Sequence, residues 1–84
     1  MYFHPKNRIC RKADVLNLLR ISKSAFYNRI SDGLFPPPIS LGGRAKGWVE
    51  QEVQATLNAM VSGKSKEQLR ALVSQIVSER SNAG

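Results

Sequence analysis

Apolar residues recur at the three- and four-residue spacing of a helix face in four segments of this chain. The four predicted helices span residues 11–19, 23–30, 50–60 and 65–80. The last pattern is the most regular, with apolar positions at i, i+3, i+4, i+7 and i+8: Leu69, Leu72, Val73, Ile76 and Val77. It predicts an amphipathic C-terminal helix that covers either its own domain or a second copy of the chain.

The first two predicted helices follow each other with three residues between them. Their inward faces are expected to carry Val15, Leu18 and Leu19 in the first helix, and Phe26 and Ile30 in the second. Ser22 is a good N-cap for the second helix, because its hydroxyl can accept a hydrogen bond from a free backbone N–H. Gly33 suits the left-handed position that follows a helix. The pattern therefore predicts two short helices joined by a tight turn.

A β-hairpin is predicted between the second and third helices. Residues 36–38 are three prolines, which exclude both a helix and a central strand, so this segment is an extended connector. Two short β-prone runs, residues 39–41 and 47–49, then flank a Gly-Gly turn. The tip of this hairpin is expected to carry Arg44 and Lys46, and Trp48 to lie at the centre of the core.

The length of the chain bounds its function. Eighty-four residues make one domain and bury enough surface for one small core, but not for a deep substrate pocket as well. A single cysteine, Cys10, and a single histidine, His4, exclude a disulfide framework and a multi-cysteine zinc site. The sequence presents no nucleophile paired with a base. We therefore expect no enzyme activity, no metal and no cofactor.

No segment resembles a signal peptide or a membrane span. The first ten residues lack the apolar stretch of about 7–15 residues that a signal peptide needs, and no run approaches the ~20 apolar residues of a spanning helix. We expect a cytoplasmic protein without a membrane partner.

Positive charge is concentrated in one half of the chain. Thirteen Lys and Arg residues against six Asp and Glu residues leave a formal net charge of +7. Residues 1–47 contain nine basic and two acidic residues, whereas residues 48–84 contain four of each. A small protein with its charge distributed in this way is suited to meet a polyanion with its basic half.

Two short helices followed by a basic hairpin are the order that a winged helix-turn-helix requires. The outer face of the second helix is polar. There Asn28 could contact adenine in the major groove, Lys23 could reach guanine or a phosphate, and Ser24 and the Tyr27 hydroxyl could donate to phosphates. The basic hairpin tip could enter the neighbouring minor groove or contact its backbone.

Three stretches of the sequence resemble the AlpA-like prophage regulatory proteins. They are RKADVL (residues 11–16), ISKSAFY (residues 21–27) and, above all, DGLFPPPISLGGRAKGW (residues 32–48). The resemblance runs from about Arg8 to Leu57. This family resembles MerR-type winged helix-turn-helix proteins and phage excisionases, and its members are DNA-binding regulators of integrated phages and genomic islands. The resemblance implies sequence-specific binding of duplex DNA in bacteria, and hence association with the nucleoid.

Two positions depart from the family pattern. The family usually has Gly in the turn between the helices, where this chain has Arg20; if that position needs a positive φ, Arg costs roughly 1 kcal/mol relative to Gly. Either the turn differs in this chain, or Arg20 is kept for a phosphate. After Tyr27 the family usually has Arg, where this chain has Asn28 followed by Arg29. The base preference of relatives therefore does not transfer directly.

The predicted fold is mainly α with a small β-hairpin wing: a winged helix-turn-helix of the MerR and excisionase type plus a C-terminal amphipathic helix. Residues 1–10 are expected to form a flexible basic arm, residues 11–61 the DNA-binding domain, and residues 62–84 the amphipathic helix and tail. The candidate DNA-contacting residues are Arg11, Lys12, Ser22, Lys23, Ser24, Tyr27, Asn28, Arg44 and Lys46.

The leading functional hypothesis is a transcriptional regulator of a prophage or genomic island that binds double-stranded DNA. The alternatives are an excisionase-type recombination directionality factor that bends attachment-site DNA, a small basic RNA-binding protein, and a protein adapter that acts through its terminal helix. A second copy bound through the C-terminal helix, an integrase and RNA polymerase stay open as protein partners.

Overall fold

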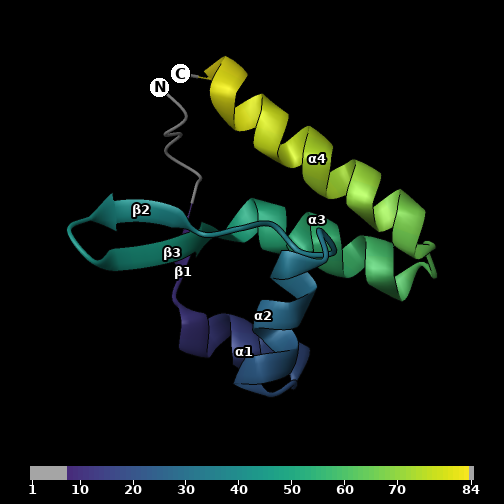
Figure 1. Ribbon diagram of the computed structural model, residues 1–84, viewed down its shortest axis with the longest axis horizontal. Coiled ribbons are helices and arrows are strands. Elements are labelled where there is room, and N and C mark those ends of the chain that lie inside the picture. Colours follow the sequence, from purple (N-terminus) through teal and green to yellow (C-terminus); the bar gives the residue numbers. More distant parts are fainter. Residues whose placement is uncertain (1–7, 84) are drawn as a thin grey trace.

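The computed structural model describes residues 8–83, which form four helices and a three-stranded antiparallel sheet of order β1-β3-β2 (Figure 1). The elements are β1 (Ile9–Cys10), α1 (Lys12–Leu19), α2 (Lys23–Ser31), β2 (Ile39–Gly42), β3 (Ala45–Val49), α3 (Glu50–Val61) and α4 (Lys66–Ala83). The predicted mainly helical fold with a β-hairpin is confirmed, and it is compatible with a winged helix-turn-helix.

The sheet contains a strand that the sequence pattern did not predict. Ile9 pairs with Val49 and Cys10 with Trp48, so β1 lies on the side of β3 opposite to β2. The prediction of a flexible arm is wrong for Ile9 and Cys10, because two residues are too short to show a strand period and only pairing with β3 defines them. The rest of the predicted arm lies outside the described residues.

Aromatic side chains form the centre of the core. The Phe26 ring of α2 lies with its centroid 5.4 Å from that of Phe35 and 5.3 Å from that of Trp48, and all three side chains are buried. The Trp48 indole N–H donates a hydrogen bond to the Pro36 carbonyl oxygen over 3.0 Å. This contact satisfies the polar end of a buried ring and ties the proline segment to the sheet. Trp48 and Phe35 are thus core residues, as predicted.

The inward face of α1 differs from the prediction by one position. Val15 is fully buried, and Leu16 and Leu19 pack against the core, whereas Leu18 is 47% exposed. Leu18 lies three residues after Val15 and Leu16 lies three residues before Leu19, so a helix of only eight residues leaves two faces almost equally apolar. The packing of α1 against β1 and β3 decides which of the two faces turns inward.

The hairpin turn is tighter than predicted. β2 ends at Gly42 and β3 begins at Ala45, and Gly42 and Gly43 have positive φ values of 104° and 56°. Arg44 lies in the turn, but Lys46 lies within β3, paired with Ser40. The expectation that Lys46 is a tip residue is therefore wrong, because the two glycines make the reversal short.

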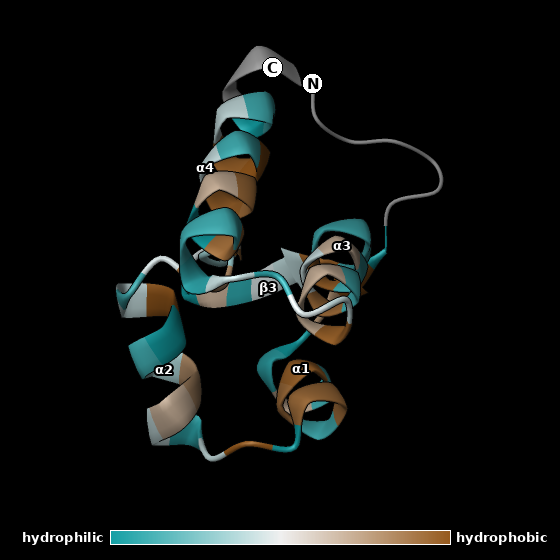
Figure 2. Ribbon diagram, turned by 90° about the vertical axis from the view of Figure 1, so that its right-hand side faces the viewer, coloured by the Kyte–Doolittle hydropathy of each residue, from teal (hydrophilic) through white to brown (hydrophobic). Residues whose placement is uncertain are grey.

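Helix α4 packs on its own domain. Leu69, Val73 and Ile76 are buried, and α4 runs along α3 above the rest of the molecule (Figures 1 and 2). Its start is a capping box, in which the Ser65 N–H donates to the Gln68 side chain and the Gln68 N–H donates to the Ser65 hydroxyl. The apolar stripe predicted from the sequence is thus largely used within the chain.

An ion pair joins the C-terminal part of α4 to α3. The Arg80 guanidinium contacts the Glu52 carboxylate, with side-chain exposures of 16% and 5%, and also donates to the Pro37 carbonyl oxygen over 2.9 Å. Arg80 therefore connects α4, α3 and the proline segment at one point.

The first prediction concerns the close contact at Gly47. A Cβ added there would lie 2.6 Å from Ile9 Cγ2 and 3.2 Å from the Cys10 carbonyl oxygen, so Gly47→Ala should destabilise the fold by about 1–3 kcal/mol through overpacking. Urea unfolding measures the change. In a double-mutant cycle with Ile9→Ala, the two losses should be less than additive; full additivity would show that the contact with Ile9 is unimportant.

The second prediction concerns the Arg80–Glu52 pair. Arg80→Met removes the guanidinium from a buried carboxylate and should lower the free energy of unfolding by about 3 kcal/mol. The double variant Glu52→Gln with Arg80→Met should regain part of this loss, because it no longer buries the charge. Thermal or urea unfolding of the wild type and the two variants provides the measurement, and a double variant less stable than Arg80→Met would contradict this explanation.

Candidate nucleic-acid interface

Helix α2 presents a polar face because its N-cap and its apolar residues orient it. The Ser22 hydroxyl accepts a hydrogen bond from the Ala25 N–H over 3.1 Å, which fixes the start of the helix. Phe26 is buried and Ile30 packs against the core, so the opposite face is exposed. The exposed residues of that face are Lys23, Ser24, Tyr27 and Asn28, as the sequence pattern predicted.

A depression of about 560 Å³ lies between the start of α1, helix α2 and the hairpin. Five of the nine predicted contact residues line it: Arg11, Lys12, Tyr27, Arg44 and Lys46. They come from three elements that are distant in the sequence. Four of the five carry a positive charge, so the depression is basic as well as concave.

Tyr27, which lines this depression, is contacted on two sides. The Lys12 ammonium lies 5.7 Å from the centroid of its ring, within the range of a cation–π interaction. The Phe26 ring lies 5.8 Å away, centroid to centroid, from within the core. The Tyr27 side chain is nevertheless 45% exposed. Its ring is therefore positioned by the protein while part of the side chain stays accessible.

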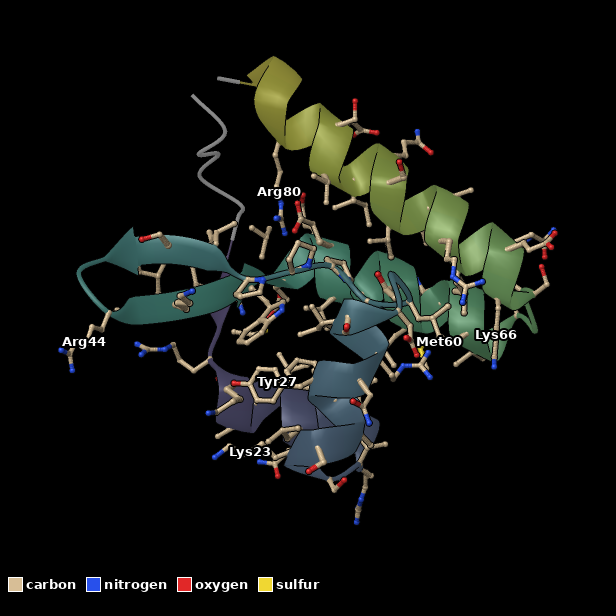
Figure 3. All side chains as sticks on the ribbon, in the orientation of Figure 1. Lys23, Tyr27, Arg44, Met60, Lys66 and Arg80 are labelled. Atoms are coloured by element: carbon tan, nitrogen blue, oxygen red, sulfur yellow. The ribbon has the colours of Figure 1, made fainter. Side chains whose placement is uncertain are left out.

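The remaining predicted residues lie beside the depression on α2. These are Ser22, Lys23, Ser24 and Asn28, all exposed. Figure 3 shows Lys23, Tyr27 and Arg44 on one side of the molecule, with Met60 and Lys66 on the other. The structure therefore divides the predicted set into a basic depression and an adjoining polar helix face.

The basic residues of the depression are not neutralised by acidic neighbours. Among the side chains of residues 8–80, the only ion pair joins Arg80 of α4 to Glu52 of α3, so none involves the basic residues of the depression. The acid closest in sequence, Asp14, accepts a hydrogen bond from the Arg11 backbone N–H over 3.0 Å and thus closes the start of α1. The charges that line the depression are therefore free to attract an anion.

The structure explains the departure at Asn28 and Arg29. Asn28 is exposed, whereas Arg29 is half-buried and one of its terminal N–H groups contacts the Met60 sulfur at 3.6 Å. Arg29 does not belong to the polar face of α2, because its side chain contacts Met60 of α3. Its spacing of three residues from the buried Phe26 is the signal that could have predicted this burial.

Other classes of site have little support in the described residues. Within residues 8–83, no group of three or more His, Cys, Asp and Glu residues could hold a metal ion. In the same part of the chain no helix is both long and apolar enough to cross a membrane. Burial raises the pKa of the Cys10 thiol, and the carboxylates of Glu50 and Asp14 raise it further. Because the thiol stays protonated near neutral pH, Cys10 acts as a small packing residue.

Comparison with known proteins gives two matches. The family described as "Prophage CP4-57 regulatory protein (AlpA)" matches residues 8–59, which contain β1 to β3 and most of α3. The chain is also 34% identical over 61 residues to the uncharacterized protein ORF88 of Enterobacteria phage P4, an alignment that covers 73% of this chain and 69% of that protein. No solved structure gives a significant match.

Proposed function

This chain belongs to the AlpA family of prophage regulatory proteins, and from that premise we propose that it binds double-stranded DNA sequence-specifically and regulates transcription of a prophage or integrated genomic island. The observation that supports the proposal most directly is the basic depression beside the polar face of α2. A helix face that reads bases and a flanking set of unpaired cations are the two parts that a specific duplex binder needs.

In the proposed complex, α2 lies in the major groove. Asn28 projects from its exposed face, where a side-chain amide can make two hydrogen bonds to adenine. Lys23 and Ser24, in the first turn of α2, contact guanine or phosphate groups, and Ser22 keeps this turn in place. Asn28 is therefore the residue to which we assign base discrimination.

The phosphate backbone follows the basic depression in this proposal. Arg11 and Lys12 approach it from α1 and Lys46 from β3, while the Tyr27 hydroxyl donates from α2. Arg44, in the hairpin turn, enters the neighbouring minor groove or binds its edge. These contacts would supply affinity and orientation for every sequence.

A single small module of this kind buries about 600–1,000 Å² on DNA, so useful specificity generally requires two copies on spaced or repeated half-sites. Because the stripe of Leu69, Val73 and Ile76 is buried on its own domain, a second copy that binds through α4 would use the outer face of this helix. The same face is available to an integrase or to RNA polymerase.

Selection of duplexes from a random pool tests the proposal. At about 150 mM salt the selected site should bind ~10³-fold or more tightly than bulk duplex. Equal affinity for all duplexes, or a preference for RNA, would contradict it. An excisionase-type factor would use the same surface, and strong bending of the selected site, measured by circular permutation, would favour that function over a regulator.

Asn28→Ala tests base reading. It should cost about 1–3 kcal/mol on the selected site and relax the preference at one base position, because the amide that distinguishes the base is lost. Binding to the selected site and to its single-base variants measures this. Asn58→Ala, on the exposed side of α3, is the matched control and should leave the preference unchanged. An equal loss on every sequence would assign Asn28 to the phosphates.

Arg44→Ala tests the backbone contact. It should weaken all duplexes similarly and reduce the slope of log affinity against log salt by about one, because one fewer counterion is released. Lys66→Ala removes a positive charge from the opposite side of the molecule and serves as the control (Figure 3). If both variants change the slope equally, the effect comes from net charge and not from the hairpin.

A further inference from the structure

Arg20 adopts a backbone conformation that its side chain disfavours. Within residues 8–83, Arg20 is the only non-glycine residue with a positive φ, at φ 57° and ψ 42°. Its N–H donates to the Leu16 carbonyl oxygen over 2.7 Å and so ends α1. In this left-handed region Gly is free of the steric conflict that a Cβ creates. Glycine at this position would therefore make the folded backbone more stable than arginine does.

No contact within the described side chains accounts for the arginine. The Arg20 side chain is exposed, and across residues 8–80 it makes no hydrogen bond, ion pair or ring contact. The residues that follow are fixed: Ile21 packs against the core, and the Ser22 hydroxyl caps α2. A strained residue thus presents a cation to solvent from a fixed corner. Such strain is a reason to look for a function.

The corner lies next to the proposed DNA-contacting end of α2. Arg20 precedes Lys23 by three residues, and both views place the link between α1 and α2 at the end of the molecule remote from α4 (Figures 1 and 2). The first turn of α2, with Lys23 and Ser24, begins at the same end. A duplex seated along α2 would bring one of its phosphate groups past this corner.

We propose that Arg20 binds a DNA phosphate beside the first turn of α2, as an additional anchor at the corner between α1 and α2. The inference rests on the proposed function. A guanidinium can bind two phosphate oxygens at once, which fixes orientation as well as adding charge attraction. The contact carries no sequence information, but it would fix how deeply α2 enters the groove.

One other explanation is available from the fold. Arg20 lies at the C-terminus of α1, where a positive charge interacts favourably with the helix dipole. This effect would stabilise the folded protein with or without DNA. The two explanations therefore differ in the sign of the stability change and in the response of DNA affinity when the side chain is removed.

The variant Arg20→Gly distinguishes a phosphate contact from an interaction with the α1 dipole. The variant should bind selected and unrelated duplexes about fivefold more weakly at about 150 mM salt, with a salt slope reduced by about one. Its urea midpoint should be equal or higher, because the backbone conflict is relieved. Arg20→Lys, which keeps the charge but not the planar fork, should keep the slope and lose part of the affinity.

Unchanged duplex affinity and salt slope in Arg20→Gly would overturn the inference, and a lower urea midpoint with that result would assign Arg20 to the α1 dipole. Arg44→Ala on the same duplexes separates this failure from a failure of the proposed function. If wild type binds the selected site and Arg44→Ala weakens it, only the Arg20 contact is refuted. If wild type shows no preference for any duplex, both proposals fail.

Discussion

The packing of Phe26 against Phe35 and Trp48 is the contact on which the rest of the structure depends. It joins one residue of α2, one at the start of the proline segment and one of β3, so it sets the position of the helix relative to the hairpin. The Trp48 indole fixes the proline segment to the sheet through the Pro36 carbonyl oxygen. Because α2 buries Phe26 here, its opposite face is presented to solvent, and the basic depression forms where that face meets the hairpin.

A domain of this size has a small hydrophobic core, and α4 enlarges that core. Its apolar stripe lies on α3, and Arg80 joins α4 to Glu52 and to the Pro37 carbonyl oxygen. The proline segment is thus fastened from two sides, by an indole from the sheet and by a guanidinium from α4. This arrangement leaves the turn of the hairpin and the outer face of α2 exposed to solvent. Arg20 fits the same division, since its side chain is exposed and makes no hydrogen bond, ion pair or ring contact within residues 8–80.

Much of the candidate site could be predicted because it is encoded locally. The exposure of Lys23, Tyr27 and Asn28 follows from their helical spacing relative to Phe26. The residues within one helical turn are enough to predict which side chains face solvent. The position of Lys46 was predicted less well, because a change of two residues in the turn moves a side chain from the tip into a strand. The depression itself could not be predicted, since its residues come from α1, α2 and the hairpin, and no short-range pattern relates them.

By itself the sequence determined the type and order of the helices and of the hairpin, the polar face of α2 and the separation of charge between the two halves. Each of these depends on residues within about one turn of a helix or on side chains alternating along a strand. Only the tertiary structure decided that Ile9 and Cys10 form a third strand, that Leu16 rather than Leu18 turns inward, and that α4 covers its own domain. These choices depend on surfaces that meet only after the chain has folded. The positive φ of Arg20 belongs to the same class, because it is a property of the folded turn in which α1 ends.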